Sequence, residues 1–360
     1  MHASKNSHER RSIMNRFLRS SILAAGLACF LANGVSAQSL EILGAGATFP
    51  YPLYSKMFYV YDSVAKVKIN YQSIGSGGGI LQLQNKTVDF GASDAFLNDK
   101  QLGEMPSPVV HIPMCLGAVT VTYNLPGNPV VKLTPEVLSG IYLGKIKKWN
   151  APEIAAVNND IKLPNSPIVV VHRSDGSGTT FIFTDYLAKV SSEWKETVGA
   201  DKSVKWPAGL GAKGNEGVSG MVKQMPGSIG YCELAYTKQN KMPQAVLENS
   251  SKEFITPSLE STSLAAGGNM PEDTRISMTN TSAKGGYPIA GFTWIILYKD
   301  QNYNQRTKEK AKATVDLLWW MIHEGQQYTK PLDYAPLPAG AVKKAEIILK
   351  SVTFDGKPLL

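Results

Sequence analysis

Residues 173–179, Arg-Ser-Asp-Gly-Ser-Gly-Thr, combine the groups that bind an oxyanion. Arg173 offers a planar fork of N–H donors, and the hydroxyls of Ser177 and Thr179 add neutral donors. Apolar β-branched residues precede this stretch and helically spaced apolar residues follow it, which predicts a strand, a turn and a helix start. The first amides of a helix attract anions because they lack intrahelical acceptors. The stretch indicates an oxyanion clamp or, equally well, a capped helix with a surface pair between Arg173 and Asp175.

Two further stretches predict the same order of strand, glycine turn and helix start. Gly-Ala-Gly-Ala-Thr-Phe-Pro at 44–50 precedes helically spaced apolar residues, and the glycine-rich run at 75–79 leads into a short helix over 80–84, with Ser76 at its start. Neither is a nucleotide motif, because Phe49 replaces the third glycine of the dinucleotide fingerprint and no Lys-Ser or Lys-Thr pair follows the second run. Taken singly, these are a plain tight turn and an ordinary N-cap.

A carboxylate, Asp94, follows a strand predicted within 87–95. An acid in this position is usually solvated or caps the next helix. Beside three helix starts that attract anions, however, a carboxylate is unfavourable unless the anion itself carries a proton. Asp94 is therefore a candidate for distinguishing a protonated anion from one without a proton.

The composition is typical of a globular protein with two cores. The chain has 360 residues, 43% hydrophobic and 18% charged, and is too polar for a multi-span membrane protein. The first 37 residues predict a secretory signal, since basic residues precede an apolar stretch at 21–30 and a small-residue cleavage site at 35–37; a membrane anchor is the alternative, but the apolar stretch is short. This segment holds five basic residues and one acidic residue, so the net charge of +8 falls to +4 without it. Such a charge does not indicate nucleic-acid binding.

No metal site or cofactor is expected. The five histidines show no paired spacing. Cys115 and Cys232 lie in apolar, strand-like runs, which favours buried free thiols over a disulfide.

The elements that must position these groups alternate between strands and helices. We expect strands at 109–112, 118–123, 228–231 and 290–298, a glycine-rich loop at 206–217, a helix at 218–225 and two closing helices; 248–284 shows no clear element. This alternation predicts an α/β fold with mainly parallel sheets in two lobes. Ligands of such folds bind outside the carboxyl ends of the strands, where the three helix starts and Asp94 fall.

Five ordered motifs resemble the periplasmic phosphate-binding protein of high-affinity ABC phosphate transporters. They lie at 44–50, 70–79, 88–94, 141–149 and 173–179, and Leu-Asp-Tyr-Ala-Pro-Leu-Pro near the C-terminus extends the match. The resemblance implies a type 2 binding-protein fold with phosphate in a cleft between two lobes. It also implies delivery of phosphate to the permease subunits of a transporter, by a protein that we expect to be a monomer.

The resemblance also implies lobe boundaries and ligands. One lobe would comprise 38–116 and 292–360 and the other 117–291, with a hinge near Leu116 and Gly291. Asp175 would orient the arginine without touching phosphate. The implied phosphate ligands are Thr48, Phe49, Ser76, Asp94, Arg173, Ser177, Gly178 and Thr179.

This ligand explains the carboxylate. Hydrogen phosphate keeps a proton near neutral pH, since its second ionisation lies at about pH 6–7 by analogy with phosphoserine. Asp94 can accept a hydrogen bond from that proton. Sulfate offers no proton, and sites of this kind reject such an analogue by roughly 10⁴–10⁵. Asp94 therefore disfavours sulfate and molybdate as ligands.

The alternative from another class is a phosphatase with Ser177 as nucleophile and His172 as base. Neighbours on a strand point to opposite faces, so His172, next to Arg173, is poorly placed to serve Ser177. The sequence therefore favours a binding protein over an enzyme.

Overall fold

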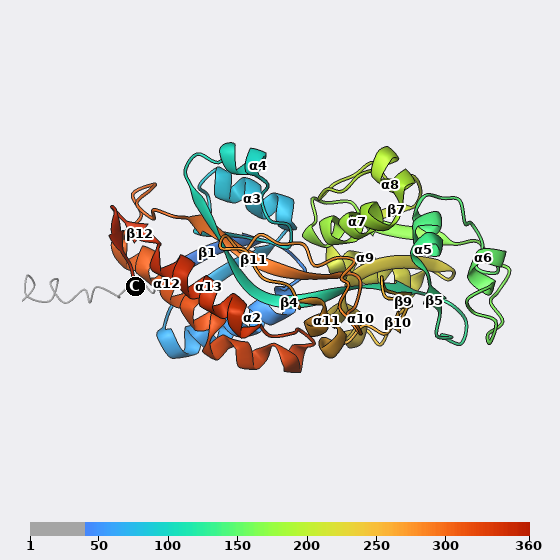
Figure 1. Cartoon of the computed structure of the whole chain (residues 1–360). Coiled ribbons are helices and arrows are strands. Elements are labelled where there is room, and N and C mark those ends of the chain that lie inside the picture. The colour runs from blue at the N-terminus through green and yellow to red at the C-terminus, as the bar shows by residue number, and fades with distance from the viewer. Residues whose placement is uncertain (1–39) are drawn as a thin grey trace, which may run out of the picture. The chain divides into compact units, whose positions relative to one another are not determined.

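The computed structural model describes residues 40–360 (Figure 1). The predicted signal peptide, 1–37, lies outside the described residues. Within 40–360, no helix has the length and apolar character needed to cross a bilayer.

The core of the described part is one eight-stranded sheet. In spatial order its strands are β2 (Lys68–Ser73), β1 (Glu41–Gly46), β3 (Phe90–Ser93), β11 (Ala290–Tyr298), β4 (Val109–Tyr123), β8 (Ser228–Glu233), β6 (Val169–Arg173) and β7 (Leu210–Ala212). At one end β1 pairs in parallel with β2 and β3, and at the other β6 pairs in parallel with β7 and β8. The two strands between these ends, β4 and β11, pair antiparallel with their neighbours. The sheet is thus α/β and mixed, parallel at its ends and antiparallel in the middle.

Strand β4 spans 15 residues, where the sequence predicted two separate strands. Pro113 is unusual within a strand, because proline cannot donate a ladder hydrogen bond. The structure places Pro113 opposite Trp294 and Cys115 opposite Thr293, so Met114 is the extra residue of a bulge in β4. The bulge accommodates the proline, and β4 continues without a break.

The middle strands connect the two ends of the sheet. The first part of β4 pairs with β11 as far as Ala118, and the rest, from Val119 to Tyr123, pairs with β8. The two predicted hinge points are paired neighbours on these strands, since Leu116 lies opposite Phe292. The division into 38–116 with 292–360 and 117–291 stays a prediction. Below, β1, β2, β3 and β11 with their helices are called the first side, and β6, β7 and β8 with theirs the second side.

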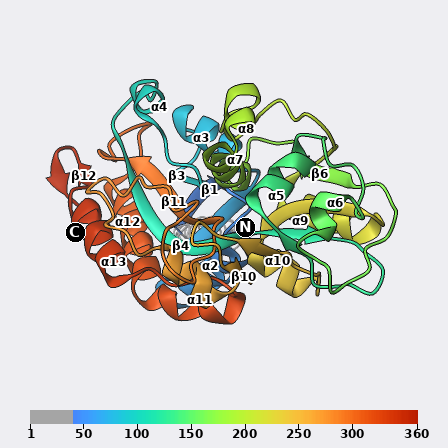
Figure 2. The ribbon, with the colours of Figure 1, turned by 45° about the vertical axis from the view of Figure 1, so that its right-hand side comes forward.

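Helices cover both faces of the sheet. On one face α3 (Ser76–Gln84) lies next to α7 (Gly178–Val190) in both views (Figures 1 and 2). The C-terminal helices α12 (Lys308–Ile322) and α13 (Ala339–Lys350) pack against each other and against β4 (Figure 1). Helix α2 (Tyr51–Ala65) follows Pro50 directly and buries Leu53, Tyr54, Met57, Phe58 and Tyr61, the spacing of one helical face. These packed faces fix the loops that follow the strands.

Several elements begin earlier than the sequence indicated. Helix α3 starts at Ser76, so the glycines at 77–79 form its first turn. The predicted loop at 206–217 contains β7 and the start of α9 (Gly214–Gln224). The segment 248–284, without a predicted element, holds β10 (Phe254–Ile255) and α11 (Leu259–Ala265).

The remaining elements each have eight residues or fewer. They are α4 (Asp99–Gly103), α5 (Pro135–Tyr142), α6 (Pro152–Ala155), α8 (Ser192–Thr197), α10 (Leu234–Gln239), the 3-10 turns Glu324–Tyr328 and Lys330–Leu332, and the short strands β5 (Lys132–Leu133), β9 (Val246–Glu248), β12 (Thr353–Phe354) and β13 (Lys357–Pro358).

Candidate functional site

Arg173, the last residue of β6, is buried beneath the start of α7. Only 3% of the residue is exposed, and its Nε and Nη2 donate to the two carboxylate oxygens of Asp175 at 2.7 and 2.5 Å. Burial opposes the charge on Arg173, but the bonds to Asp175 outweigh it and raise the pKa of the guanidinium. Burial likewise opposes the charge on Asp175, and the arginine holds the pKa of that carboxyl below its ordinary value. The interpretation as a surface pair is therefore wrong: this is a buried cation with its own counter-charge.

The start of α7 presents donors next to this arginine. Ser177 is the N-cap and its Oγ accepts from the Thr180 amide at 3.0 Å, so the capped-helix interpretation is correct for this residue. Thr179 Oγ1 accepts from Arg173 Nη1 at 3.3 Å. The amide of Thr179 is at the second helical position and has no intrahelical acceptor. The cap and the buried cation thus form one group of donors.

The starts of α3 and α7 meet directly. Ser76 Oγ accepts from the Gly178 amide at 3.0 Å and from the Asp94 amide at 3.3 Å. The Gly77 amide donates to Gly176 O at 2.9 Å, a second link between the two sides. A Cβ at Gly178 would lie 2.6 Å from Ser76 Oγ and from Asp94, so only glycine allows this approach. The Gly178 amide, predicted to face the ligand, is bonded to Ser76 in this structure.

Asp94 lies at the end of β3, inside this contact. It is 2% exposed and does not cap the next helix, which Asn98 caps. Its Oδ1 is buried without a hydrogen-bond partner within 40–360. Burial raises the pKa of its carboxyl from 3.8 to about 7, against the smaller opposing effects of Thr293 and Arg173. A buried carboxylate with one oxygen unpaired is an acceptor that lacks a donor.

The loop between β1 and α2 completes the cluster. Thr48 is 2% exposed, and its Oγ1 accepts from Asn215 Nδ2 at 2.7 Å. The Tyr236 hydroxyl donates to Thr48 O at 2.6 Å, and the Tyr334 hydroxyl donates to Phe49 O at 2.7 Å. Because Asn215 also reaches Thr179, the structure brings all eight predicted residues into one connected cluster.

Three of these partners, Asn215, Tyr236 and Tyr334, were not predicted from the sequence. Asn215 is fully buried at the start of α9, directly after Gly214, which has a φ of +74°. The glycine-rich composition around it suggested a loop and concealed a fourth helix start. Tyr334 lies within the C-terminal run that carries the family resemblance, but nothing in its sequence neighbourhood indicates its partner.

The geometry does not assemble a hydrolytic pair. The His172 ring stacks on Trp206, with centroids 4.8 Å apart and planes 12° apart. Its Nδ1 lies 3.0 Å from the backbone oxygen of Arg173. His172 is therefore held away from Ser177, whose Oγ is engaged in capping the helix.

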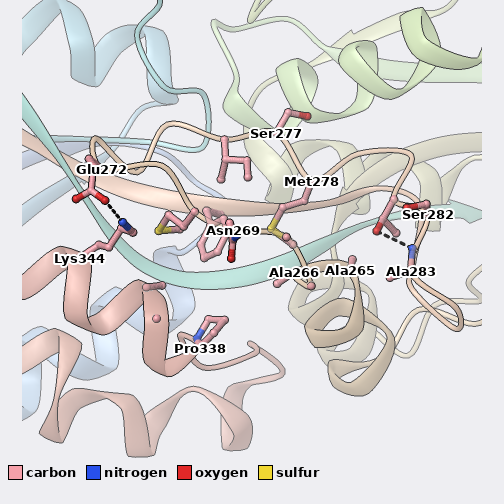
Figure 3. A pocket seen from close by; sticks show the side chains of 18 residues that line it. Ala265, Ala266, Asn269, Glu272, Ser277, Met278, Ser282, Ala283, Pro338 and Lys344 are labelled. Atoms are coloured by element: carbon pink, nitrogen blue, oxygen red, sulfur yellow. Dashed lines mark hydrogen bonds and ion pairs between the residues drawn. The ribbon is translucent and has the colours of Figure 1, made fainter.

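A groove lies away from this cluster, between α11 and α13 (Figure 3). This groove has a volume of about 790 Å³, and its lining includes Ala265, Met278, Phe292 and Pro338. Phe292 lines the groove while its strand neighbour Thr293 lies near Asp94, so the groove and the cluster lie on opposite faces of β11. Its lysine, Lys344, is paired with Glu272 (Figure 3). The groove thus lacks the donor set of the cluster.

Known proteins share both the sequence and the fold. A protein-family model described as "PBP superfamily domain" matches residues 32–322. The phosphate-binding protein PstS of Pasteurella multocida is 44% identical over 338 residues, covering 92% of this chain and 96% of the relative. PstS of Haemophilus influenzae is 44% identical over 311 residues, covering 85% and 91%.

Solved structures agree on the fold. The phosphate-binding protein of Stenotrophomonas maltophilia superposes with a TM-score of 0.65 at 18% identity, covering 85% of this chain and 93% of that one. The resemblance inferred from the five motifs is therefore confirmed. The chain belongs to the PstS phosphate-binding proteins of the PBP superfamily.

Proposed function

We propose that this protein binds inorganic phosphate between the two sides of its sheet and delivers it to an ABC transporter. The relatives named above are phosphate-binding proteins, and the match to them covers most of the chain. The observation that carries the proposal is the cluster itself: three helix starts, a buried arginine and an unpaired buried carboxylate lie in hydrogen-bonded contact.

The predicted ligands act through hydroxyls, backbone amides and one guanidinium. The hydroxyls of Thr48, Ser76, Ser177 and Thr179 donate to phosphate oxygens, together with amides of the helix starts and Arg173. Asp175 balances the arginine, so Arg173 adds little net positive charge to the site. The anion is then held chiefly by neutral donors, which a helix start supplies without a net charge.

Asp94 sets the selectivity. Its carboxylate has one buried oxygen with no donor, and hydrogen phosphate brings a donor to it. Sulfate would place oxygen lone pairs against the same carboxylate, and neither group could then be satisfied.

Binding is coupled to closure of two lobes about β4 and β11. The lobes are 38–116 with 292–360 and 117–291, and the bonds from Gly178 to Ser76 and from Asn215 to Thr48 link them. Phosphate would hold this closed arrangement by contacting both lobes. If X-ray scattering curves with and without phosphate coincide, the closure is wrong.

The predicted signal peptide and the family support a periplasmic location, where permease subunits of the transporter would receive phosphate from the protein. Hydrolysis is disfavoured because His172 is stacked on Trp206. Incubation with p-nitrophenyl phosphate checks this directly: we expect no turnover, and sustained release of p-nitrophenol would indicate an enzyme.

Calorimetric titration with phosphate, arsenate and sulfate tests the function. We expect saturable binding of one phosphate per chain and a rise in melting temperature with phosphate, because a ligand stabilises the state that binds it. Sulfate is expected to produce neither. Absence of phosphate binding by the folded protein would refute the proposal.

A further inference from the structure

Asn215 occupies a position between two of the proposed phosphate donors. It lies at the start of α9 on the second side and is fully buried. Its Nδ2 donates to Thr48 Oγ1 at 2.7 Å and to Thr179 Oγ1 at 3.0 Å. The first of these hydroxyls belongs to the first side and the second to α7, so one amide group spans the cluster.

The orientation of the Asn215 amide is fixed by its other end. Oδ1 accepts from the Glu233 amide at 2.9 Å. An N–H can donate only to an oxygen here, so this bond decides which end of the side chain is Oδ1. Nδ2 must then point toward Thr48 and Thr179, and both of its hydrogens are used.

This arrangement determines the direction of two hydroxyl protons. Thr48 Oγ1 accepts a second bond from the backbone N–H of Asn215 at 3.2 Å. Thr179 Oγ1 accepts a second bond from Arg173 Nη1 at 3.3 Å. A hydroxyl has two lone pairs and one proton, so accepting twice leaves the proton as its only remaining contact. Within 40–360 neither hydroxyl donates to a protein group. Both protons are available to a ligand that only accepts.

The backbone of Thr48 is also held by a hydrogen bond. Tyr236, also on the second side, donates to Thr48 O at 2.6 Å. Asn215 and Tyr236 thus fix the hydroxyl and the carbonyl of the same residue. The orientation of the Thr48 donor depends on contacts that the second side supplies.

We propose that Asn215 is a positioning residue that turns the hydroxyls of Thr48 and Thr179 into obligatory donors toward the bound anion. Asn215 does this without touching the anion itself. The inference rests on the proposed phosphate-binding function and deepens it: the site selects an acceptor-rich oxyanion because its hydroxyls have no acceptor capacity left. The pairing across the two sides also makes this donor set complete only in the closed arrangement.

A double-mutant cycle separates positioning from a structural role. Asn215→Ala in the otherwise unchanged protein is expected to weaken phosphate binding about tenfold to a hundredfold, since two oriented hydrogen bonds are lost. In a Thr179→Val background the same change is expected to cost only about threefold to tenfold, because one of the two hydroxyls that it orients is already absent. Equal losses in both backgrounds would overturn the proposal, because a structural residue acts independently of Thr179.

A second variant and a matched control complete the experiment. Asn215→Asp keeps the size but offers only acceptors, so both hydroxyls turn toward it and phosphate binding falls further than in Asn215→Ala. If the alanine variant does not fold, the cycle is run with the aspartate variant against the same criterion. Asn158 is the control: it is 2% exposed, and within 40–360 its side chain bonds only to the backbone of Lys132 and Ile154. Asn158→Ala is expected to lower the melting temperature and leave phosphate affinity unchanged.

The same titrations test the phosphate-binding function and the role of Asn215 separately. If the folded, otherwise unchanged protein does not bind phosphate, the proposed function fails. If that protein binds phosphate and Asn215→Ala binds it equally well, the function stands and the role of Asn215 is refuted.

Discussion

The loop after β3 and the loop after β6 each bring one aspartate to the cluster, in opposite electrostatic surroundings. Asp175, after β6, is paired with both nitrogens of the Arg173 fork, and the pKa of its carboxyl is lowered. Asp94, after β3, is more deeply buried, has one oxygen without a partner, and has a pKa raised to about 7. The same residue type thus serves as a permanent counter-charge in one loop and as an acceptor in the other.

Breaking the paired carboxylate is expected to have the largest effect on stability. Asp175→Asn leaves Arg173 buried without a counter-charge, and removing one partner of a buried pair costs about 3–5 kcal/mol. Urea unfolding of the ligand-free protein measures this loss. The control is Asp273→Asn, which breaks a pair between an exposed carboxylate and Arg275 at the same two-residue spacing. Arg275 keeps Asp99 as a second partner, so the loss is expected to be less than about 1 kcal/mol. Similar losses in the two variants would contradict a buried role for Asp175.

The unpaired carboxylate of Asp94 should make the stability of the ligand-free protein depend on pH. The pKa of Asp94 in the folded protein, about 7, exceeds its ordinary value of 3.8, so the folded state binds more protons between these values. Ligand-free stability should therefore be greatest at low pH in this window and fall as pH rises from about 4 to about 7, by at most about 4 kcal/mol. Asp94→Asn should remove this fall and be more stable than the unchanged protein at about pH 8. Unfolding curves across this range provide the measurement, and a profile unaffected by the substitution would refute the raised pKa.

The two loops meet at Gly178, and enlarging this residue should separate them. Gly178→Ala places a methyl group 2.6 Å from Ser76 Oγ and from Asp94, and overpacking of this kind costs about 1–3 kcal/mol. We expect phosphate affinity to fall by about tenfold to a hundredfold in a titration. Gly220→Ala, in α9 with no atom near the added methyl group, should leave the affinity unchanged. An unaltered affinity in Gly178→Ala would show that the helix starts do not need to approach.

Salt is expected to have the smallest effect. Because Arg173 is already balanced by Asp175 and the remaining donors are neutral and buried, screening has little charge to act on. Phosphate affinity should fall less than about threefold between about 0.05 and about 0.5 M salt of an inert anion. A steep loss over this range would indicate exposed cations as the main ligands.

Much of this comparison was predictable from local sequence. The positions of Ser76, Asp94 and Ser177 follow from strand and helix patterns, because each lies where a strand ends or a helix begins. The family resemblance then predicted that all three residues bind phosphate. Burial of Arg173, in contrast, depends on packing between distant segments, and the sequence left it open as a surface pair.

The errors have physical causes that single residues explain. The sequence predicted two strands where β4 is continuous, because a bulge in β4 at Met114 accommodates Pro113 within the strand. Asn215 was missed because its partner Thr48 is 167 residues away and glycine-rich composition around it resembles a loop. Contacts of this length come from tertiary packing, which local patterns do not encode.

In the proposed site, Asp94 accepts a hydrogen bond from the proton that the bound anion retains. Calorimetry of Asp94→Asn with phosphate and with sulfate at the same pH tests it most directly. The account predicts weaker phosphate binding and a gain of sulfate affinity, because the asparagine amide can donate to an oxygen that the carboxylate would repel. Phosphate binding that persists in this variant with no gain of sulfate affinity would contradict it.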